Sequence, residues 1–225
     1  MARTRFSAAE NGFHFANRFV NVMARLPDGR TVQTSGRCGG MSFAALDCFF
    51  AGVAIPAQRS ADFPDGGIPA DGTPIADYIM RRQLDSFVSL TALRFVTWTV
   101  RPDHGMLGLP GVYAETRQEL RDIRARVDAG SPVPLGLISA KAHGIGDLVH
   151  NHQVVAYGYD DGADGGTRLY AYDNNHPDTE VVLTVPGGHG VVTASTGEEW
   201  RGVFRQAYDR RTPPADLGEP APAEG

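Results

Sequence analysis

The chain has 225 residues, of which 42% are hydrophobic and 21% are charged, and its formal net charge at pH 7 is −5. A chain of this size and composition can bury a sizeable core as one domain or two small ones. Acidic residues outnumber basic ones and no basic cluster stands out, so we expect no nucleic-acid partner. Only two cysteines are present, too few for a disulfide framework, so each thiol is either a core residue or chemically active.

The two ends of the chain carry no predicted chemistry. The first residues are basic, but no apolar run typical of a signal peptide follows, and no run approaches the ~20 residues that cross a bilayer. We therefore expect no membrane partner and a cytoplasmic location, with signal-independent export left open. Residues 212–225 contain four prolines and a single leucine, which predicts a disordered tail.

The N-terminal part of the chain predicts a hairpin followed by a buried helix. Residues 13–23 alternate partly between apolar and polar side chains, and the Pro-Asp-Gly turn at 27–29 lets residues 31–33 pair back. After a glycine-flanked turn, apolar residues recur at three- and four-residue spacing. This pattern predicts a helix over about 38–51 that ends at Gly52.

The middle of the chain predicts two more helices. Residues 74–87 place most apolar side chains on one face, and the proline at position 74 suits a first helical turn. Residues 114–129 have one apolar and one charged face, and Gly130 ends that helix. Residues 56–73 predict a loop, and the 53–111 segment as a whole carries no readable motif.

The last third of the chain changes to β character. Short runs rich in Val, Tyr and Leu, separated by Asp-Gly and Gly-Gly turns, predict strands at 133–139, 152–159, 168–173, 180–185 and 203–208. Helices first and strands later predict an α+β fold with a helical front and an antiparallel sheet behind.

Cys38 stands where the glycine-flanked turn becomes the first turn of a predicted helix. Unpaired N–H groups and the helix dipole favour the nucleophilic thiolate at such a position. Gly39 and Gly40 leave room for a substrate carbonyl, and the Cys38 N–H and the Gln33 amide are candidate oxyanion donors. The alternative is an inert thiol with two glycines that serve only tight packing. Cys48, on the apolar face of the same helix, is predicted to be a core residue.

A cysteine nucleophile needs a base, and His152 is the best placed of the seven histidines. It begins one predicted strand, and Asp173 ends the next. If these strands are antiparallel neighbours, the two side chains lie side by side, and Asp173 orients the imidazole as the third member of a triad. The alternative is that Asp173 is a turn residue in Asp-Asn-Asn.

Several histidines near the predicted strands also suggest a metal site. They are His143, His150, His152 and His176. Neither a helical His-x-x-x-His pair nor a Cys-x-x-Cys knuckle accompanies them, so we expect no metal and no cofactor. The glycine-rich stretches at 162–166 and 187–190 lack a phosphate-loop lysine, which argues against nucleotide binding.

The order of these candidate residues resembles that of papain-like cysteine peptidases, in particular the bacterial branch that includes the peptidase domains of bacteriocin exporters. Residues 36–47 resemble the nucleophile helix of that superfamily, and residues 151–159 are similar to its histidine strand. Tyr172-Asp173 matches the aspartate that usually precedes a proline, although Asn174 follows it here. Gly40 stands where typical papains have serine or alanine.

The resemblance implies one papain-like domain over residues 1–211. A helical lobe of about 30–130 would carry the cysteine and pack on a sheet lobe of about 131–209 plus the N-terminal hairpin. A peptide or protein substrate would bind in the cleft between the lobes. If Asp173 does not orient the histidine, Asn174 or Asn175 takes that role, as asparagine does in papain.

The sequence therefore predicts a cysteine hydrolase that cleaves an amide bond, peptide or isopeptide, through a Cys-His-Asp triad and a thioester acyl-enzyme. Two alternatives use the same residues. One is a protein glutamine deamidase or transglutaminase-like enzyme, which differs in the acceptor and leaving group. The other is a catalytically idle papain-like module that binds peptides.

Overall fold

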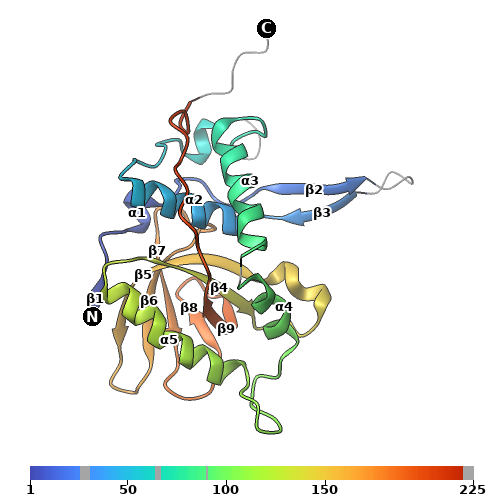
Figure 1. The fold of residues 1–225 in the computed structure, drawn as a ribbon, viewed down its shortest axis with the longest axis vertical. Helices are drawn as coiled ribbons and strands as arrows, with labels where there is room; N and C mark the ends of the chain where they lie inside the picture. The colour runs from blue at the N-terminus through green and yellow to red at the C-terminus, as the bar shows by residue number, and fades with distance from the viewer. Residues whose placement is uncertain (26–30, 64–66, 90, 220–225) are drawn as a thin grey trace.

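The computed structural model describes residues 1–25, 31–63, 67–89 and 91–219, with the backbone alone at 22–25, 31–35 and 145 (Figure 1). Its helices are α1 (Ala8–Asn11), α2 (Cys38–Ala51), α3 (Pro74–Phe87), α4 (Ala92–Val100) and α5 (Val112–Asp128), with short 3-10 helices η1 (Ser60–Asp62) and η2 (Ile145–His150). Its strands are β1 (Ala2–Arg3), β2 (Val20–Arg25), β3 (Thr31–Ser35), β4 (Val133–Ser139), β5 (His152–Asp161), β6 (Thr167–Tyr172), β7 (Glu180–Val185), β8 (Val192–Ala194) and β9 (Glu199–Arg205).

The described strands form one antiparallel sheet and a separate hairpin. The sheet has the order β1-β5-β4-β9-β8-β7-β6, and it closes on itself because β5 also pairs with β6. The hairpin of β2 and β3 extends away from the rest of the molecule (Figure 1). The predicted combination of helices and an antiparallel sheet is therefore confirmed.

Most predicted elements appear at or near their expected positions. Helices α2 and α3 have the predicted bounds, and α5 begins two residues earlier than expected, at Val112. Thr73 caps α3 by accepting the Ala76 N–H at 3.3 Å, and Gly52 ends α2 with a φ of 67°, which suits glycine. Helix α4 lies within the 53–111 segment, at residues for which the sequence predicted no helix or strand. The last strand, β9, begins and ends earlier than the predicted strand at 203–208.

The boundary of the helical lobe differs from the prediction. Side chains of α5, such as Ile123, pack in one hydrophobic core with the strands, and Trp98 of α4 packs with Ile138 of β4 and Phe204 of β9. Helix α5 lies across the sheet (Figure 1). The apolar stripes of α4 and α5 cover the sheet, whereas the predicted boundary of about 30–130 placed both helices with the helical lobe.

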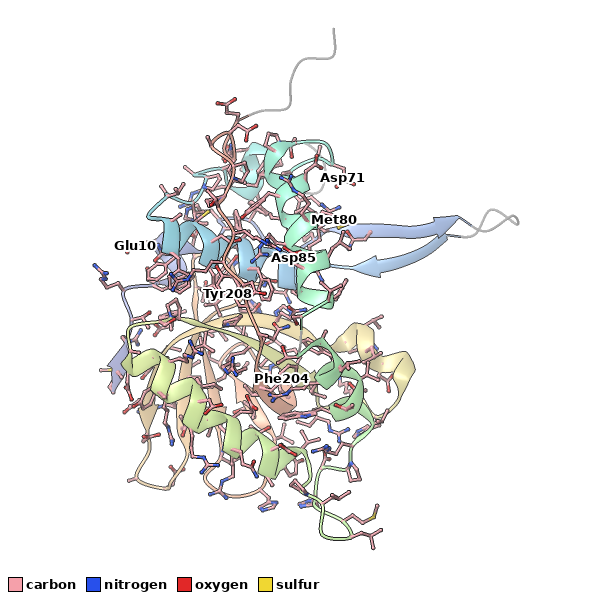
Figure 2. The ribbon with its side chains drawn as sticks, viewed as in Figure 1. Glu10, Asp71, Met80, Asp85, Phe204 and Tyr208 are labelled. Atoms are coloured by element: carbon pink, nitrogen blue, oxygen red, sulfur yellow. The ribbon has the colours of Figure 1, made fainter. Side chains whose placement is uncertain are left out.

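Residues 212–219 of the predicted tail make contacts with the helical lobe. Leu217, the single leucine of that segment, is only 3% exposed and joins the core of the helical lobe. Gln58 Nε2 donates to the Gly218 carbonyl at 2.6 Å. From Phe204 past Tyr208 the chain runs from the sheet across α2 to the helical lobe (Figure 2). Residues 220–225 lie outside the described part of the chain.

No helix among the described residues is long and apolar enough to cross a membrane.

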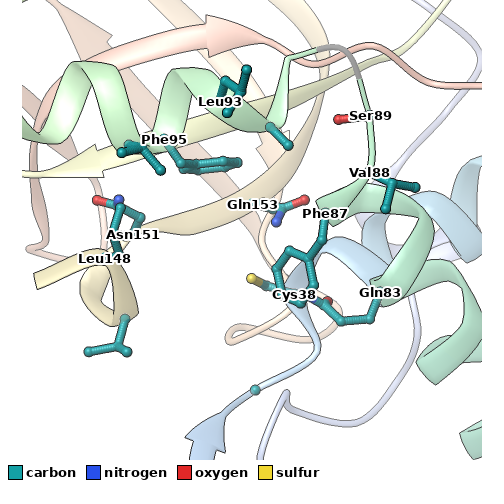
Figure 3. Close-up of a pocket in the computed structure, with 14 residues that line it drawn as sticks. Cys38, Gln83, Phe87, Val88, Ser89, Leu93, Phe95, Leu148, Asn151 and Gln153 are labelled. Carbon is teal, nitrogen blue, oxygen red and sulfur yellow. The ribbon is translucent and has the colours of Figure 1, made fainter. Parts of the chain in front are cut away.

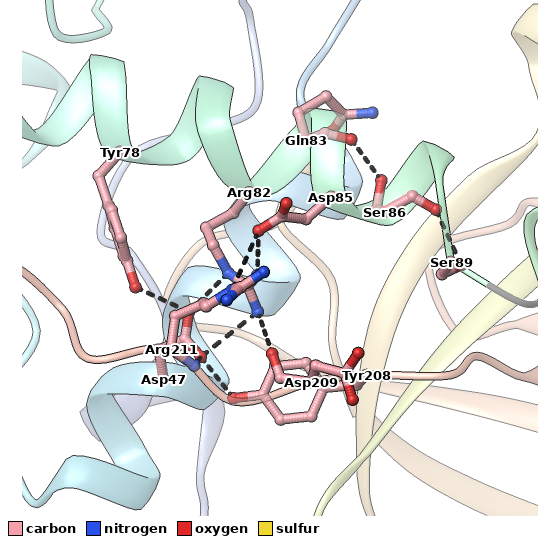
Figure 4. A network of polar contacts seen from close by, with 10 residues as sticks. All are labelled: Asp47, Tyr78, Arg82, Gln83, Asp85, Ser86, Ser89, Tyr208, Asp209 and Arg211. Carbon is pink, nitrogen blue, oxygen red and sulfur yellow. Dashed lines mark hydrogen bonds and ion pairs between the residues drawn. The ribbon is translucent and has the colours of Figure 1, made fainter.

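A buried carboxylate joins α2, α3 and the C-terminal segment (Figure 4). Asp47 accepts hydrogen bonds from the hydroxyls of Tyr78 at 2.9 Å and Tyr208 at 2.6 Å, and from the Arg211 N–H at 2.8 Å. It also forms an ion pair with Arg82 at 2.7 Å. Every partner comes from outside α2, so this one side chain fixes the helix in the interior.

We expect Asp47→Asn to lower the free energy of unfolding by about 3 kcal/mol, because it leaves the Arg82 guanidinium buried beside a neutral group. Asp85→Asn is the matched control, since Asp85 pairs with the same arginine from a partly exposed position. That change should cost less than about 1 kcal/mol. Urea unfolding of both variants measures the difference, and equal losses would contradict the role given to Asp47.

Candidate active site

The first turn of α2 is held in place by the residue before it. Arg37 is buried, and its main-chain N–H donates to Asn17 Oδ1 at 2.6 Å. Its guanidinium donates to Asn21 Oδ1 at 2.7 Å and to Asp71 Oδ1 at 2.6 Å. Because Arg37 is anchored at both its backbone and its side chain, the position of Cys38 is strongly constrained.

The structure brings Cys38, His152 and Asp173 together. Strands β5 and β6 are antiparallel, with Val155 opposite Tyr172, so the start of β5 lies beside the end of β6 as predicted. His152 Nε2 is 2.8 Å from Asp173 Oδ1, and Cys38 lies close enough to His152 to contribute to the raised pKa of the imidazole. Histidine and aspartate are buried, whereas Cys38 is partly exposed.

The ionisation of the histidine and the aspartate is coupled. Burial lowers the pKa of His152, but the charge and hydrogen bond of Asp173, with a smaller contribution from Cys38, raise it well above its ordinary value of 6.5. Burial raises the pKa of Asp173, but His152 and the Asn175 N–H outweigh it and lower that pKa below 3.8. Each partner therefore favours the charged form of the other.

An aromatic ring covers the histidine. The Trp200 indole stacks on the His152 ring, with centroids 5.8 Å apart and an interplanar angle of 19°. An aromatic face against the imidazole excludes water from the His152–Asp173 hydrogen bond and strengthens it.

The two asparagines named as alternative orienters make other contacts. Asn174 Nδ2 donates to the carbonyls of Cys38 at 3.1 Å and Gln153 at 2.9 Å, and so ties α2 to β5. Asn175 uses its main-chain N–H, which donates to Asp173 Oδ1 at 2.8 Å. Only Asp173 reaches the imidazole among these three residues.

The two glycines after Cys38 serve packing rather than access for a substrate carbonyl, which corrects the expectation. A Cβ on Gly40 would lie 2.1 Å from the Ile79 carbonyl oxygen of α3. A Cβ on Gly39 would lie 2.3 Å from Ser86 Oγ and 2.4 Å from Gln153 Oε1. Both glycines are buried, so α2 approaches α3 and β5 at this point without intervening side chains.

The remaining sequence candidates divide clearly. Gln33 lies in β3 opposite Val22, but its side chain lies outside the described residues. Cys48 is fully buried, and burial, with the nearby charge of Asp47, raises the pKa of its thiol to about 12. Cys48 is therefore the core residue that its position on the helix predicted.

The histidines of the suggested metal cluster make separate contacts. His143 bonds with Arg201 at 2.9 Å, and His176 Nε2 is 3.1 Å from Glu198 Oε1, whereas His152 faces Asp173. Among the described residues, no group of three or more His, Cys, Asp or Glu side chains could hold a metal ion.

Cys38 opens into a pocket of about 670 Å³ (Figure 3). The end of α3, helix α4 and η2 supply mostly apolar walls, including Phe87, Val88, Leu93, Phe95, Val96 and Val149. No charged side chain is among the described residues that line it. Gln83 and Gln153 lie beside the cysteine, and Gln83 Oε1 accepts the Gly40 N–H at 2.8 Å.

Several residues that shape this site were not identified from the sequence. Gln83 caps the first turn of α2 from a different helix, and Trp200 reaches His152 from β9. Neither is near Cys38 or His152 in the chain, so no local motif marks them. Arg37 also shapes the site, and unlike Gln83 and Trp200 it is adjacent in the chain to Cys38.

Comparison of the chain with protein-family models, with curated proteins and with solved structures finds no match. The interpretation of the site therefore depends on its own geometry.

We expect His152 in the folded protein to titrate well above pH 6.5, and Asp173→Asn to lower its pKa, because burial then acts without the opposing carboxylate. The stability from the raised His152 pKa is full below the unfolded histidine pKa and is lost as the pH rises through the folded one. The stability from the lowered Asp173 pKa is lost as the pH falls through the folded aspartate pKa. NMR titration of the His152 ring measures both values.

Asn175→Ala is the matched control for that titration. It keeps the main-chain N–H that bonds Asp173, so the His152 pKa should stay at the wild-type value. A fall as large as that caused by Asp173→Asn would instead identify Asn175 as the orienting residue.

Proposed function

We propose that the protein is a cysteine hydrolase that cleaves amide bonds, with a papain-like arrangement in which Cys38 attacks, His152 transfers the proton and Asp173 orients His152. The observation that carries the proposal is the hydrogen-bonded pair of His152 and Asp173 next to Cys38, which lines the pocket. A buried, oriented imidazolium beside an accessible thiol at a helix start is the arrangement that favours a reactive thiolate.

In this mechanism the Cys38 thiolate attacks the substrate carbonyl carbon and forms a tetrahedral oxyanion. Asp173 holds His152 Nε2, which leaves Nδ1 to donate its proton to the departing amine. Collapse of the oxyanion breaks the C–N bond and leaves a thioester. Neutral His152 then takes a proton from water, the resulting hydroxide attacks the thioester, and the carboxylic acid leaves while the thiolate and imidazolium are restored.

The oxyanion requires donors next to the sulfur. The Cys38 N–H at the start of α2 is one candidate, as the sequence suggested. Gln83 is a second candidate, because the Gly40 N–H holds its Oε1 and leaves its NH₂ group to donate into the pocket that Cys38 lines. Gln33 stays a candidate from the sequence.

The walls of the pocket favour a substrate with a large apolar group next to the scissile carbonyl. Phe87, Leu93 and Val149 are all more than half exposed, and exposed apolar side chains around a polar centre are typical of a ligand site. The uncharged lining gives a charged side chain no compensation for lost hydration. A peptide or protein segment with apolar residues at this position is the substrate class that we propose.

We expect Cys38→Ala and His152→Ala each to lower the rate of amide hydrolysis of an apolar peptide library by a factor of about 10⁴ or more. The thiol and the imidazole act as a unit, so the loss of either one removes the function of both. Iodoacetamide should label Cys38 faster than a free thiol, and Cys48→Ala should keep this reactivity. Mass spectrometry of the products separates cleavage from glutamine deamidation. Wild-type activity in Cys38→Ala would overturn the proposal, and ordinary thiol reactivity would indicate an idle binding module.

We expect Leu93→Asp to raise KM for apolar substrates by about tenfold or more with little change in kcat, because it places a charge in the pocket wall away from the reacting atoms. Leu84→Asp is the matched control, since Leu84 is 53% exposed on α3 and outside the lining, against 73% for Leu93. Steady-state kinetics that show equal effects of both changes would contradict the assigned pocket.

A further inference from the structure

A second, smaller pocket lies at the opposite end of α2 from Cys38. Its volume is about 130 Å³, and Phe50, in the last turn of α2, forms part of its wall. Twelve residues of helix separate Phe50 from Cys38, which is about 18 Å along the axis. The other walls come from the end of α5, the start of β4, the end of β9 and the segment that follows β9.

A buried amide faces this pocket without a partner. Gln206 is only 1% exposed, and neither its Oε1 nor its Nε2 has a hydrogen-bond partner among the described residues. Its main-chain N–H donates to the Pro134 carbonyl at 2.9 Å, so the residue is held in position beside β4. Buried side-chain amides are nearly always hydrogen-bonded, and one with both ends unpartnered indicates a ligand that both accepts and donates.

The same pocket contains three arginines. Arg126, Arg205 and Arg210 line the pocket, and within the described part of the chain none of their guanidiniums forms an ion pair. Arg210 lies over the Phe50 ring, 3.6 Å from its centroid. The nearby Glu119 is already engaged, because it pairs with Arg94 and accepts the main-chain N–H of Arg205.

No carboxylate is among the described residues that line the pocket. Three arginines and a neutral hydrogen-bonding group therefore line one small space. Planar guanidiniums match the oxygen atoms of carboxylates and phosphates, and more than one guanidinium favours a doubly charged group over a singly charged one.

We propose that this pocket binds a phosphate group, as the free ion or as a small monoester. The arginines would bind its charged oxygens, Gln206 Nε2 would donate to one oxygen, and Gln206 Oε1 would accept from a protonated oxygen or a neighbouring hydroxyl. Ser131 also lines the pocket and carries a further hydroxyl, whereas the Tyr208 hydroxyl already donates to Asp47. The site is separate from the pocket at Cys38, so it does not depend on the proposed hydrolase function.

Isothermal titration with inorganic phosphate and with glycerol phosphate, at an ionic strength held constant with chloride, tests this site in the whole protein. We expect saturable binding of one equivalent and a shift of the Gln206 side-chain amide signals in NMR spectra. Tighter binding of glycerol phosphate than of inorganic phosphate would identify a phosphorylated small molecule as the ligand. Equal binding of the two would identify the free ion as the ligand. Acetate should bind at least about tenfold more weakly, and acetate binding as tight as phosphate would overturn the assignment.

Gln206→Met and Arg205→Gln should each weaken phosphate binding by about tenfold or more. Arg121→Gln is the matched control, because it removes the same charge from an exposed position on α5 outside the pocket. Arg126→Gln provides a surface variant should Gln206→Met fail to fold. Cys38→Ala should bind phosphate as the wild type does, whatever its hydrolase activity. Equal weakening by Arg121→Gln, or no shift of the Gln206 amide, would overturn the proposal.

Discussion

The buried Asp47 carboxylate determines where α2 lies, and the candidate site depends on that helix. Asp47 is itself part of α2, yet its partners Tyr78, Arg82, Tyr208 and Arg211 come from α3 and from the segment after β9. A buried carboxylate is stable only with such partners, so helix and partners must come together for either to be buried. The C-terminal segment thereby becomes part of the helical lobe, with Leu217 in its core.

The opposite end of the same helix is held by different means. Gly39 and Gly40 allow contact with α3 and β5 at distances that no side chain would permit. Gln83 then caps the Gly40 N–H, and the Asn174 amide donates to both the Cys38 and Gln153 carbonyls. These contacts join α2 to the strand that begins at His152. The geometry of the thiol and the imidazole is thus a consequence of core packing in both lobes.

The proposed chemistry and the proposed phosphate site occupy the two ends of α2. At its start, Cys38 opens into an apolar pocket without charged walls; at its end, Phe50 borders a pocket with three unpaired arginines among the described residues. Tyr208 belongs both to that second pocket and to the set of Asp47 partners. A ligand there would contact the residues that position the helix.

The sequence by itself determined the local elements and the candidate triad. Helices 38–51 and 74–87 and the strand at 180–185 follow from spacing and from capping residues, which act within a few positions of the chain. The adjacency of His152 and Asp173 also follows, because two consecutive antiparallel strands place the start of one beside the end of the other.

Only the tertiary structure decided what surrounds those residues. Gln83 and Arg82 reach α2, and Trp200 reaches His152, from distant parts of the chain. Leu217 lies in a segment whose composition predicts disorder. The assignment of α5 to the sheet lobe likewise depends on which surface its apolar stripe covers. Periodicity shows that a face is apolar, but the partner of that face is set by the packing of the whole chain.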